Sequence, residues 1–280
     1  MLANYALIDR AADQLAAKGV RLDKAYERRD PKEPHRQQKE LFEDRVAKPV
    51  RQLFRSQQAL VSAWAEDLRP PTKAMPELPA ELVLAISQLN LDDEAAEAAI
   101  LMALSEAGDD AVTLFAEQAS IGLDLALYQA LSTAYVREHI GVMIQGINST
   151  TLRAVQQAVA TYFEIPGMTL RDLVSMLPFG PQRALDIART EITQTYGEIN
   201  RLAGEQLASE VPDVLVEETW FTNRSDTVCP MCMGLDGVSR KPGEPFIHRS
   251  TGKRYMSSRD THPRCACWTR VRTRILGGKA

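Results

Sequence analysis

The four cysteines of this chain lie in two short clusters near its C-terminal end, and a histidine accompanies the second cluster. Residues 229–237 read C-P-M-C-M-G-L-D-G, and residues 262–267 read H-P-R-C-A-C. Thiolates and imidazoles are ligands that zinc prefers, and a structural zinc site takes four ligands in a tetrahedron. The two clusters therefore predict one zinc site, whose candidate ligands are Cys229, Cys232, His262, Cys265 and Cys267.

The spacing of the five candidates leaves the choice of the four ligands open. Cys229 and Cys232 are separated by two residues, so a turn can point both sulfurs at a common centre. In a strand, Cys265 and Cys267 would share a face and both could bind, or His262 could replace one of them. The thiols could instead stay unmetallated, or form disulfides in an exported particle. A thioredoxin-like redox site is not expected, because no βαβ pattern surrounds the first cluster.

The acidic residues near the clusters bear on whether the zinc is catalytic. A catalytic zinc normally keeps an open ligand position with an acid nearby. Asp226, Asp236 and Asp260 are close in sequence. Four thiols in one small module nevertheless favour a closed site, so we expect a structural zinc and no catalytic residue.

The composition is that of an ordinary globular protein, with 45% hydrophobic and 25% charged residues among 280. No apolar run approaches the roughly 18 residues needed to span a membrane. The first ten residues do not have the pattern of a secretory signal, so we expect synthesis in a cytosol and no membrane partner.

The charge is distributed unevenly along the chain. Residues 240–280 hold eleven Lys and Arg and two acids, a local charge of +9, whereas the other residues sum to −13. Residues 74–136 contain eleven acids and neither Lys nor Arg. Such polarity predicts a different partner for each end, although solubility and pairing between the two halves would also account for it.

The first half of the chain reads as helices interrupted by loops. Helical spacing is expected over residues 5–18 and 37–67, with Pro49 kinking or splitting the second helix. Four prolines in residues 68–79 predict a linker, so residues 1–69 form an N-terminal helical arm. In an acidic helical domain over residues 70–147, we expect Asp92 or Asp93 to cap a helix that Gly108 ends. Asp109 and Asp110 would start the next helix, and a third would run from about 123 to 147 with His139 in a structural role.

The remaining residues, 148–280, are expected to combine helices with a small basic β-rich cap. A helix starts at Ser149 or Thr150, Thr169 and Asp172 resemble a capping box, and a long helix covers about 182–209. Strands are predicted for Val214 to Phe221 and Cys267 to Ile275, with a hairpin that turns near Gly252. The predicted fold class is therefore α+β, with a mostly helical N-terminal two-thirds.

An ordered set of motifs in this last segment resembles the phage Mu F-like minor head protein, or head morphogenesis, family. The long helix contains Arg189-Thr190-Glu191, followed by Tyr196 and Asn200. Trp220-Phe221-Thr222, Asp226, the first cysteine cluster with Asp236-Gly237, and the His262 cluster follow in order. The resemblance covers roughly residues 148–270. We interpret the Arg-Thr-Glu motif as an ion pair that fixes the helix against the cap.

The resemblance implies a low-copy structural protein of a tailed phage or prophage head, without enzymatic activity. Its expected location is the virion, in the head interior or at the portal vertex, after assembly in the bacterial cytoplasm. The implied partners are the portal protein, the major capsid or scaffold protein, and DNA bound without regard to sequence. The candidate DNA contacts are Arg264, Arg270, Arg272, Arg274 and Lys279.

A metal-dependent nuclease or hydrolase, in the form of a toxin-like module, is the alternative function. It would use Glu191, Asp226 or His262 with the metal. The sequence contains no compact set of carboxylates of the kind that a two-metal site needs, which argues against this alternative.

Overall fold

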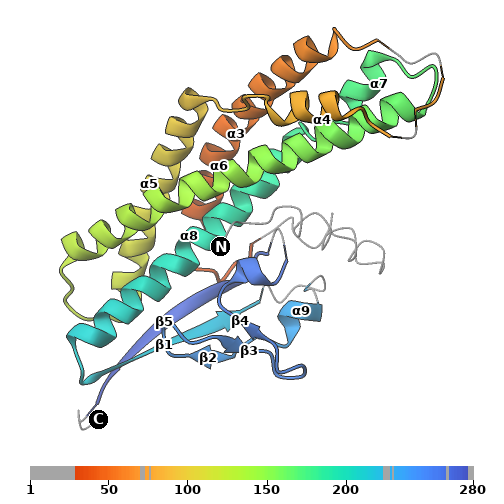
Figure 1. Ribbon diagram of the computed structural model, residues 1–280. Coiled ribbons are helices and arrows are strands. Elements are labelled where there is room, and N and C mark those ends of the chain that lie inside the picture. The colour runs from red at the N-terminus through yellow and green to blue at the C-terminus, as the bar shows by residue number, and fades with distance from the viewer. Residues whose placement is uncertain are drawn as a thin grey trace.

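The computed structural model describes residues 29–69, 73–75, 77–222, 228, 230–262 and 265–276. A long helical bundle carries a small β-rich cap on one side of its lower half (Figure 1). The predicted α+β fold is therefore confirmed, and the helix expected over residues 5–18 lies outside the described residues. The long helices of the described part are α3 (Arg36–Ala65), α5 (Glu94–Ala119), α6 (Leu125–Glu164) and α8 (Pro181–Glu210).

Helix α3 continues through Pro49 and is not split there. Pro49 is buried, and it lies on the same side as Val46, Val50 and Leu53, which are fully buried. A proline in a helix interior costs about 3 kcal/mol or more because it removes a backbone hydrogen bond. Packing of this apolar face against α5 and α8 outweighs that cost.

The predicted helix end at Gly108 is wrong, because α5 runs on to Ala119. Gly108 lies where α5 crosses α6, and a Cβ built on it would be 2.3 Å from Ser132 Oγ. The glycine therefore permits a close helix–helix approach instead of ending the helix. Asp110 does not cap a new helix either, since its carboxylate accepts hydrogen bonds from Tyr196 and His35. The predicted cap at Asp93 is confirmed, because its side chain accepts the backbone N–H of Ala96.

The predicted break between residues 147 and 149 is also wrong, because α6 is one helix of 40 residues. Ser149 and Thr150 both donate hydrogen bonds to the carbonyl of Gly146. Such back-bonding satisfies a hydroxyl inside a helix and makes a new cap unnecessary. Thr151 and Asn148 meet the buried Gln57 of α3, which fixes this middle turn of α6 in the bundle.

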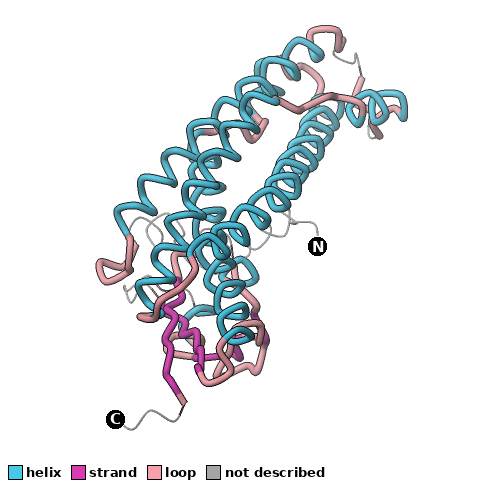
Figure 2. Tube along the Cα trace, turned by 90° about the vertical axis from the view of Figure 1, so that its left-hand side faces the viewer, coloured by secondary structure: helices cyan, strands magenta, loops and turns pink. Residues whose placement is uncertain are grey.

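Short helices close the end of the bundle that lies far from the cap (Figures 1 and 2). Helix α4 (Ala80–Ser87) follows the proline-rich segment, and α7 (Leu170–Ser175) begins with the predicted capping box of Thr169 and Asp172. Both pack on a second hydrophobic cluster with the C-terminal part of α6. Leu68, Met75 and Leu78 from the segment predicted as a linker pack on this cluster.

The cap is built on a three-stranded antiparallel sheet in the order β2-β1-β5. Strand β1 (Val214–Phe221) is central and pairs with β5 (Trp268–Ile275) over its whole length. Strand β2 (Ser239–Arg240) pairs with the other edge of β1. Helix α8 and these two strands confirm the long helix predicted for about residues 182–209 and the two strands predicted after it.

A second hairpin and the helical bundle hold the sheet in place. Strand β3 (Phe246–Ile247) pairs with β4 (Arg254–Tyr255), and Gly252 between them has a φ of 66°, as the predicted turn requires. At the outer edge of the sheet, the backbone N–H of Val271 donates to Gln118 Oε1 of α5 at 2.7 Å. The end of α5 thus occupies the hydrogen-bonding edge that β5 would otherwise leave open.

A single hydrophobic cluster joins the bundle to the cap, and it contains Phe42, Leu104 and Val271. These residues come from all three predicted segments, 1–69, 70–147 and 148–280. The boundary predicted after residue 147 falls inside α6. The three segments therefore share a core. None of the helices in the described residues is long and apolar enough to cross a membrane.

Candidate metal centre

The first cysteine cluster is positioned by the loop that leaves β1. A short helix, α9 (Pro230–Met233), carries Cys232, and Gly234 follows it. A Cβ on Gly234 would be 2.2 Å from the ring of His248, so only glycine lets the β3–β4 hairpin close on this loop. The backbone N–H of Arg249 donates to the carbonyl of Gly234 across the same contact.

The predicted Asp236-Gly237 turn is confirmed, and it returns the chain to the sheet. Gly237 has a φ of 69°, and its N–H donates to the carbonyl of Trp220 at 2.7 Å. Asp236 accepts hydrogen bonds from the backbone and the hydroxyl of Thr222. The turn thus fixes the loop that carries Cys232 against the end of β1.

Three of the five predicted ligands meet in a buried cluster. Cys232 Sγ is 3.2 Å from His262 Nε2 and 3.7 Å from Cys265 Sγ. The three ligand atoms lie within 4.8 Å of one another, and each residue is at most 4% exposed. This cluster could hold a metal ion. The two sulfurs are too far apart for the roughly 2.05 Å of a disulfide bond.

The distances agree with a tetrahedral zinc site. With Zn–S about 2.3 Å and Zn–N about 2.0 Å, two sulfurs would be about 3.8 Å apart and a sulfur and a nitrogen about 3.5 Å apart. The observed separations are 3.7 Å and 3.2 Å. Cys267 is outside the three-residue group, although it is buried and hydrogen bonded to Cys265. Cys229 lies outside the described residues.

The electrostatics of the cluster favour a thiolate. Burial alone would raise the pKa of the Cys265 thiol. Hydrogen bonds with Cys232 and Cys267 and the charge of His262 reverse this effect and lower the pKa well below its ordinary value. Because the thiolate is the form that binds a metal, the surroundings of Cys265 suit a ligand.

Comparison of the chain with protein-family models, curated proteins and solved structures gave no match. The interpretation of this cluster therefore depends on its own geometry and on the residues around it.

The acids near the cluster in sequence are engaged in local structure. Asp236 accepts from Thr222, and Asp260 caps the 3₁₀ helix η1 (Ser258–Asp260) through the backbone of Ser257. Asp226 lies outside the described residues. The described acids thus stabilise turns of the cap, which agrees with a closed site in which the metal has a structural role.

The Arg-Thr-Glu motif lies inside the bundle. Glu191 is fully buried and pairs with His139 Nε2 of α6 at 2.5 Å, and Arg189 lies 3.5 Å from Glu43 of α3. The His139 ring stacks on Tyr135 one turn earlier. These two contacts join α8 to other helices, rather than to the cap as the sequence predicted.

The predicted basic side of β5 is present. Arg270, Arg272 and Arg274 are exposed and alternate with Val271 and Thr273, which face the bundle side. An acid partly offsets this charge, because Glu217 of β1 is the cross-strand neighbour of Arg272. Of the other candidate DNA contacts, Arg264 and Lys279 lie outside the described residues.

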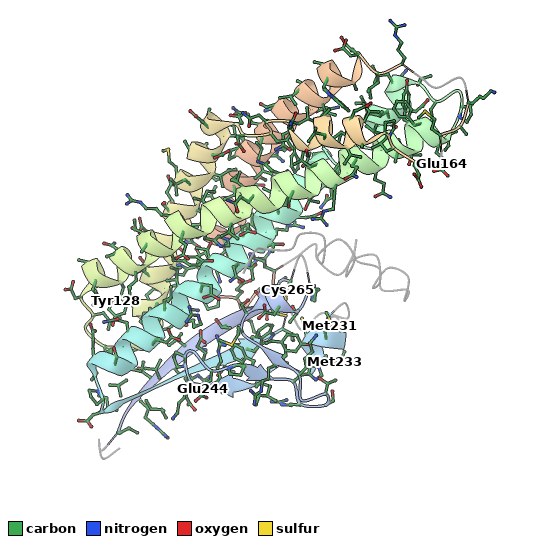
Figure 3. All side chains as sticks on the ribbon, viewed as in Figure 1. Tyr128, Glu164, Met231, Met233, Glu244 and Cys265 are labelled. Atoms are coloured by element: carbon green, nitrogen blue, oxygen red, sulfur yellow. The ribbon has the colours of Figure 1, made fainter. Side chains whose placement is uncertain are left out.

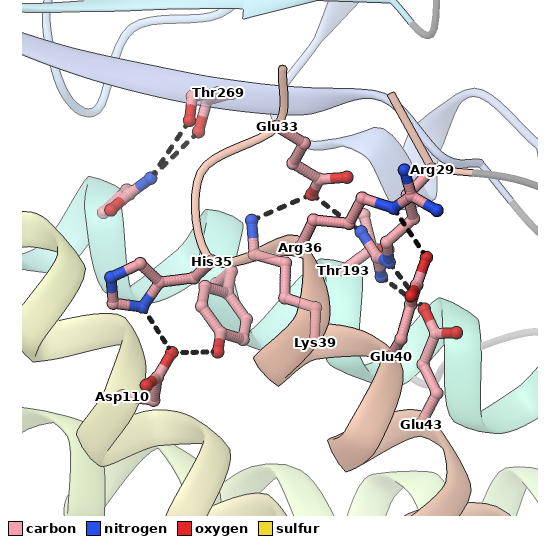
Figure 4. A network of polar contacts seen from close by, with 12 residues as sticks. Arg29, Glu33, His35, Arg36, Lys39, Glu40, Glu43, Asp110, Thr193 and Thr269 are labelled. Atoms are coloured by element: carbon pink, nitrogen blue, oxygen red, sulfur yellow. Dashed lines mark hydrogen bonds and ion pairs between the residues drawn. The ribbon is translucent and has the colours of Figure 1, made fainter. Parts of the chain in front are cut away.

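A buried polar network beside the cap was not predicted from the sequence (Figure 4). Arg29 donates to Glu43 and to Glu33, and Lys39 donates to the same oxygen of Glu33 at 2.8 Å. All four side chains are at most 6% exposed. Burial lowers the pKa of Lys39, against the opposing charge of Glu33. The sequence signal that could have revealed this network was the pair Lys39 and Glu43. These two charged residues lie one turn apart in α3, on turns that also carry its buried apolar face.

Proposed function

We propose that this protein is a structural and interaction protein in which a metal ion holds together a small basic cap that packs on a helical bundle. The observation that carries the proposal is the buried cluster of Cys232, His262 and Cys265, which joins the loop after β1 to the segment before β5. Structural zinc sites have closed thiolate and imidazole shells of this kind. We propose zinc as the metal, with Cys229 or Cys267 as the fourth ligand.

The metal content of the purified protein tests the proposed zinc site. Purified full-length protein is expected to hold about one zinc per chain, and Cys232→Ser and Cys265→Ser are each expected to lose most of it. Met233→Ser is the matched control, because it places serine in the same short helix at a position that is 61% exposed. Equal zinc content in all four proteins would contradict the assignment of these ligands.

We further propose that the chain is a minor head protein of a tailed phage or prophage. The order of motifs along α8 and the cap supports this role. So does the polarity of the molecule, since the acidic stretch lies in α4, α5 and the start of α6, while basic residues line β5. The bundle would dock on the portal and on the major capsid or scaffold protein, within the virion.

Assembly in the phage or prophage of origin tests this role. The gene is expected beside those for the portal, the scaffold or protease and the major capsid protein. The protein is expected to sediment with procapsids and to be missing from particles assembled without the portal. A soluble protein that never enters procapsids would contradict the proposal.

The basic side of β5 is proposed to contact DNA through phosphates. Replacing Arg270, Arg272 and Arg274 by glutamine should reduce binding to duplexes of any sequence and lower the slope of affinity against salt by about three. The matched control replaces three exposed helical arginines, Arg137, Arg153 and Arg171. Equal losses in both triple variants would show that net charge alone is responsible.

The residues considered for a metal-dependent hydrolase do not converge in the described structure. Glu191 is paired with His139 among the helices, whereas His262 is at the thiol cluster. A hydrolytic metal site needs an activated water together with a base within hydrogen-bond reach. The arrangement therefore favours the structural role.

A further inference from the structure

Cys267 is a buried thiol beside the metal cluster, and the cluster does not include it. The residue is 5% exposed, and its side chain is hydrogen bonded to Cys265. Its sulfur is nevertheless not among the ligand atoms that Cys232, His262 and Cys265 bring within 4.8 Å of one another. Cys267 therefore has a role of its own, and the role that we infer for it rests on the zinc site of the proposed function.

A fourth zinc ligand must lie close to all three of the others. In a tetrahedral zinc site, a sulfur ligand is about 3.8 Å from each other sulfur and about 3.5 Å from an imidazole nitrogen. The separations of Cys232 Sγ from Cys265 Sγ, 3.7 Å, and from His262 Nε2, 3.2 Å, are of this size. Because Cys267 Sγ lies outside this group, the geometry fits a neighbour of the ligand shell better than a member of it.

The backbone next to Cys267 is held by the sheet. Cys267 directly precedes Trp268, the first residue of β5. Trp268 is the cross-strand partner of Phe221, and the two rings stack with their centroids 4.5 Å apart. Bringing the Cys267 sulfur into the ligand shell would require movement of the residue next to this first pair of the sheet.

The position of His262 limits how many sulfurs the shell can take. Spacing alone allowed both Cys265 and Cys267 to bind, or His262 to replace one of them. In the structure, His262 is 4% exposed and belongs to the cluster with Cys232 and Cys265. Only one of four ligand places is then left, and Cys229 and Cys267 are the two candidates for it.

A hydrogen bond from Cys267 suits a thiolate that binds zinc. The thiolate is the form of cysteine that binds a metal, and a protonated thiol can donate its S–H. The contact with Cys267 is one of those that oppose the effect of burial on the pKa of Cys265. Groups that hydrogen bond to a metal ligand orient it, and replacing them typically costs about 10–100-fold in metal affinity.

We propose that Cys267 is a positioning residue of the zinc site, which donates its S–H to the Cys265 thiolate and does not bind the metal. Cys229, which lies outside the described residues, is then the fourth ligand. The site would hold three thiolates and one imidazole on the zinc, with one thiol beside them.

Two substitutions of Cys267 separate hydrogen bonding from metal binding. Cys267→Ser keeps a donor, whereas Cys267→Val fills the space and removes the donor. X-ray absorption at the zinc edge of the full-length proteins should show three sulfurs and one nitrogen for the wild type and for both variants. In competition with a chelator, Cys267→Val should bind zinc about tenfold or more weakly than the wild type, and Cys267→Ser should recover most of this loss.

The number of sulfurs on the zinc distinguishes the contrary results. If Cys267→Ser loses one sulfur or loses the zinc, as Cys265→Ser is expected to do, Cys267 is a ligand and the proposal is overturned. Equal zinc affinity of the wild type and Cys267→Val would also overturn it, because the donor would then contribute nothing. Should Cys267→Val fold poorly, the sulfur number of Cys267→Ser still decides. A wild-type protein without zinc would instead overturn the proposed zinc site, and the role of Cys267 with it.

Discussion

At the scale of single residues, the ligand types were more predictable than their partners. Cys232, His262 and Cys265 were among the five candidate ligands that residue type and spacing predicted, because few combinations of residue types bind zinc. The sequence could not show that Cys267, two residues further on, lies outside this cluster. It also could not place Glu191 opposite His139, since the two residues are 52 positions apart and meet only through helix packing.

The buried pair of Arg240 and Glu218 shows how strongly one residue is expected to affect the cap. Glu218 is fully buried and bonded to the guanidinium at 2.7 and 2.8 Å. Burial raises the pKa of Glu218, and Arg240 opposes the rise. Arg240→Met keeps the apolar stem but leaves a buried carboxylate unpaired, so it should lower the free energy of unfolding by about 3 kcal/mol at pH 7.

The dependence on pH distinguishes this cause from lost packing. Because burial raises the pKa of Glu218 in the folded state, its ionised form costs stability, and the cost grows as the pH rises above the ordinary value of 4.5. The deficit of Arg240→Met in denaturant unfolding should therefore shrink towards pH 4.5. Glu218→Leu combined with Arg240→Met should recover most of it. A deficit that is independent of pH would contradict this explanation.

At the scale of elements, the sequence predicted well which segments are helices or strands and which residues cap them. It did not predict that two of the helices continue without a break. The caps at Asp93 and Thr169, helix α8 and the two long strands follow from local chemistry, which the sequence displays directly. The breaks expected near Gly108 and Ser149 were wrong, because contacts with other helices decide what those residues do. Local signals of this kind cannot distinguish a helix end from a helix crossing.

The crossing at Gly108 gives a testable difference between these two roles. In an exposed helix, Gly→Ala stabilises by about 1 kcal/mol. Here the new methyl would be 2.3 Å from Ser132 Oγ, so Gly108→Ala should lower the free energy of unfolding by about 1–3 kcal/mol. Adding Ser132→Ala removes the clashing oxygen and should restore stability. A stabilised single variant would show that the two helices are not in close contact there.

At the scale of the whole molecule, the sequence predicted the fold class but not how the parts join. Three separate segments were expected, whereas one hydrophobic cluster runs from α3 to β5. The cap, where Figure 3 labels Cys265, is also joined to the bundle by hydrogen bonds that link β5 to Gln118 of α5 and Asn200 of α8. A buried network around Glu33 lies beside the cap (Figure 4). Such a network is invisible in sequence, because Arg29, Glu33 and Lys39 look like an ordinary solvated connector until the cap covers them.

The structural zinc site in the cap is the central claim. X-ray absorption at the zinc edge of the purified full-length protein tests it most directly. We expect a four-ligand shell with three sulfurs at about 2.3 Å and one nitrogen at about 2.0 Å. Cys265→Ser should lose one sulfur from this shell or lose the metal. A shell made mainly of oxygen, or a protein that takes up no zinc when grown with it, would contradict the account.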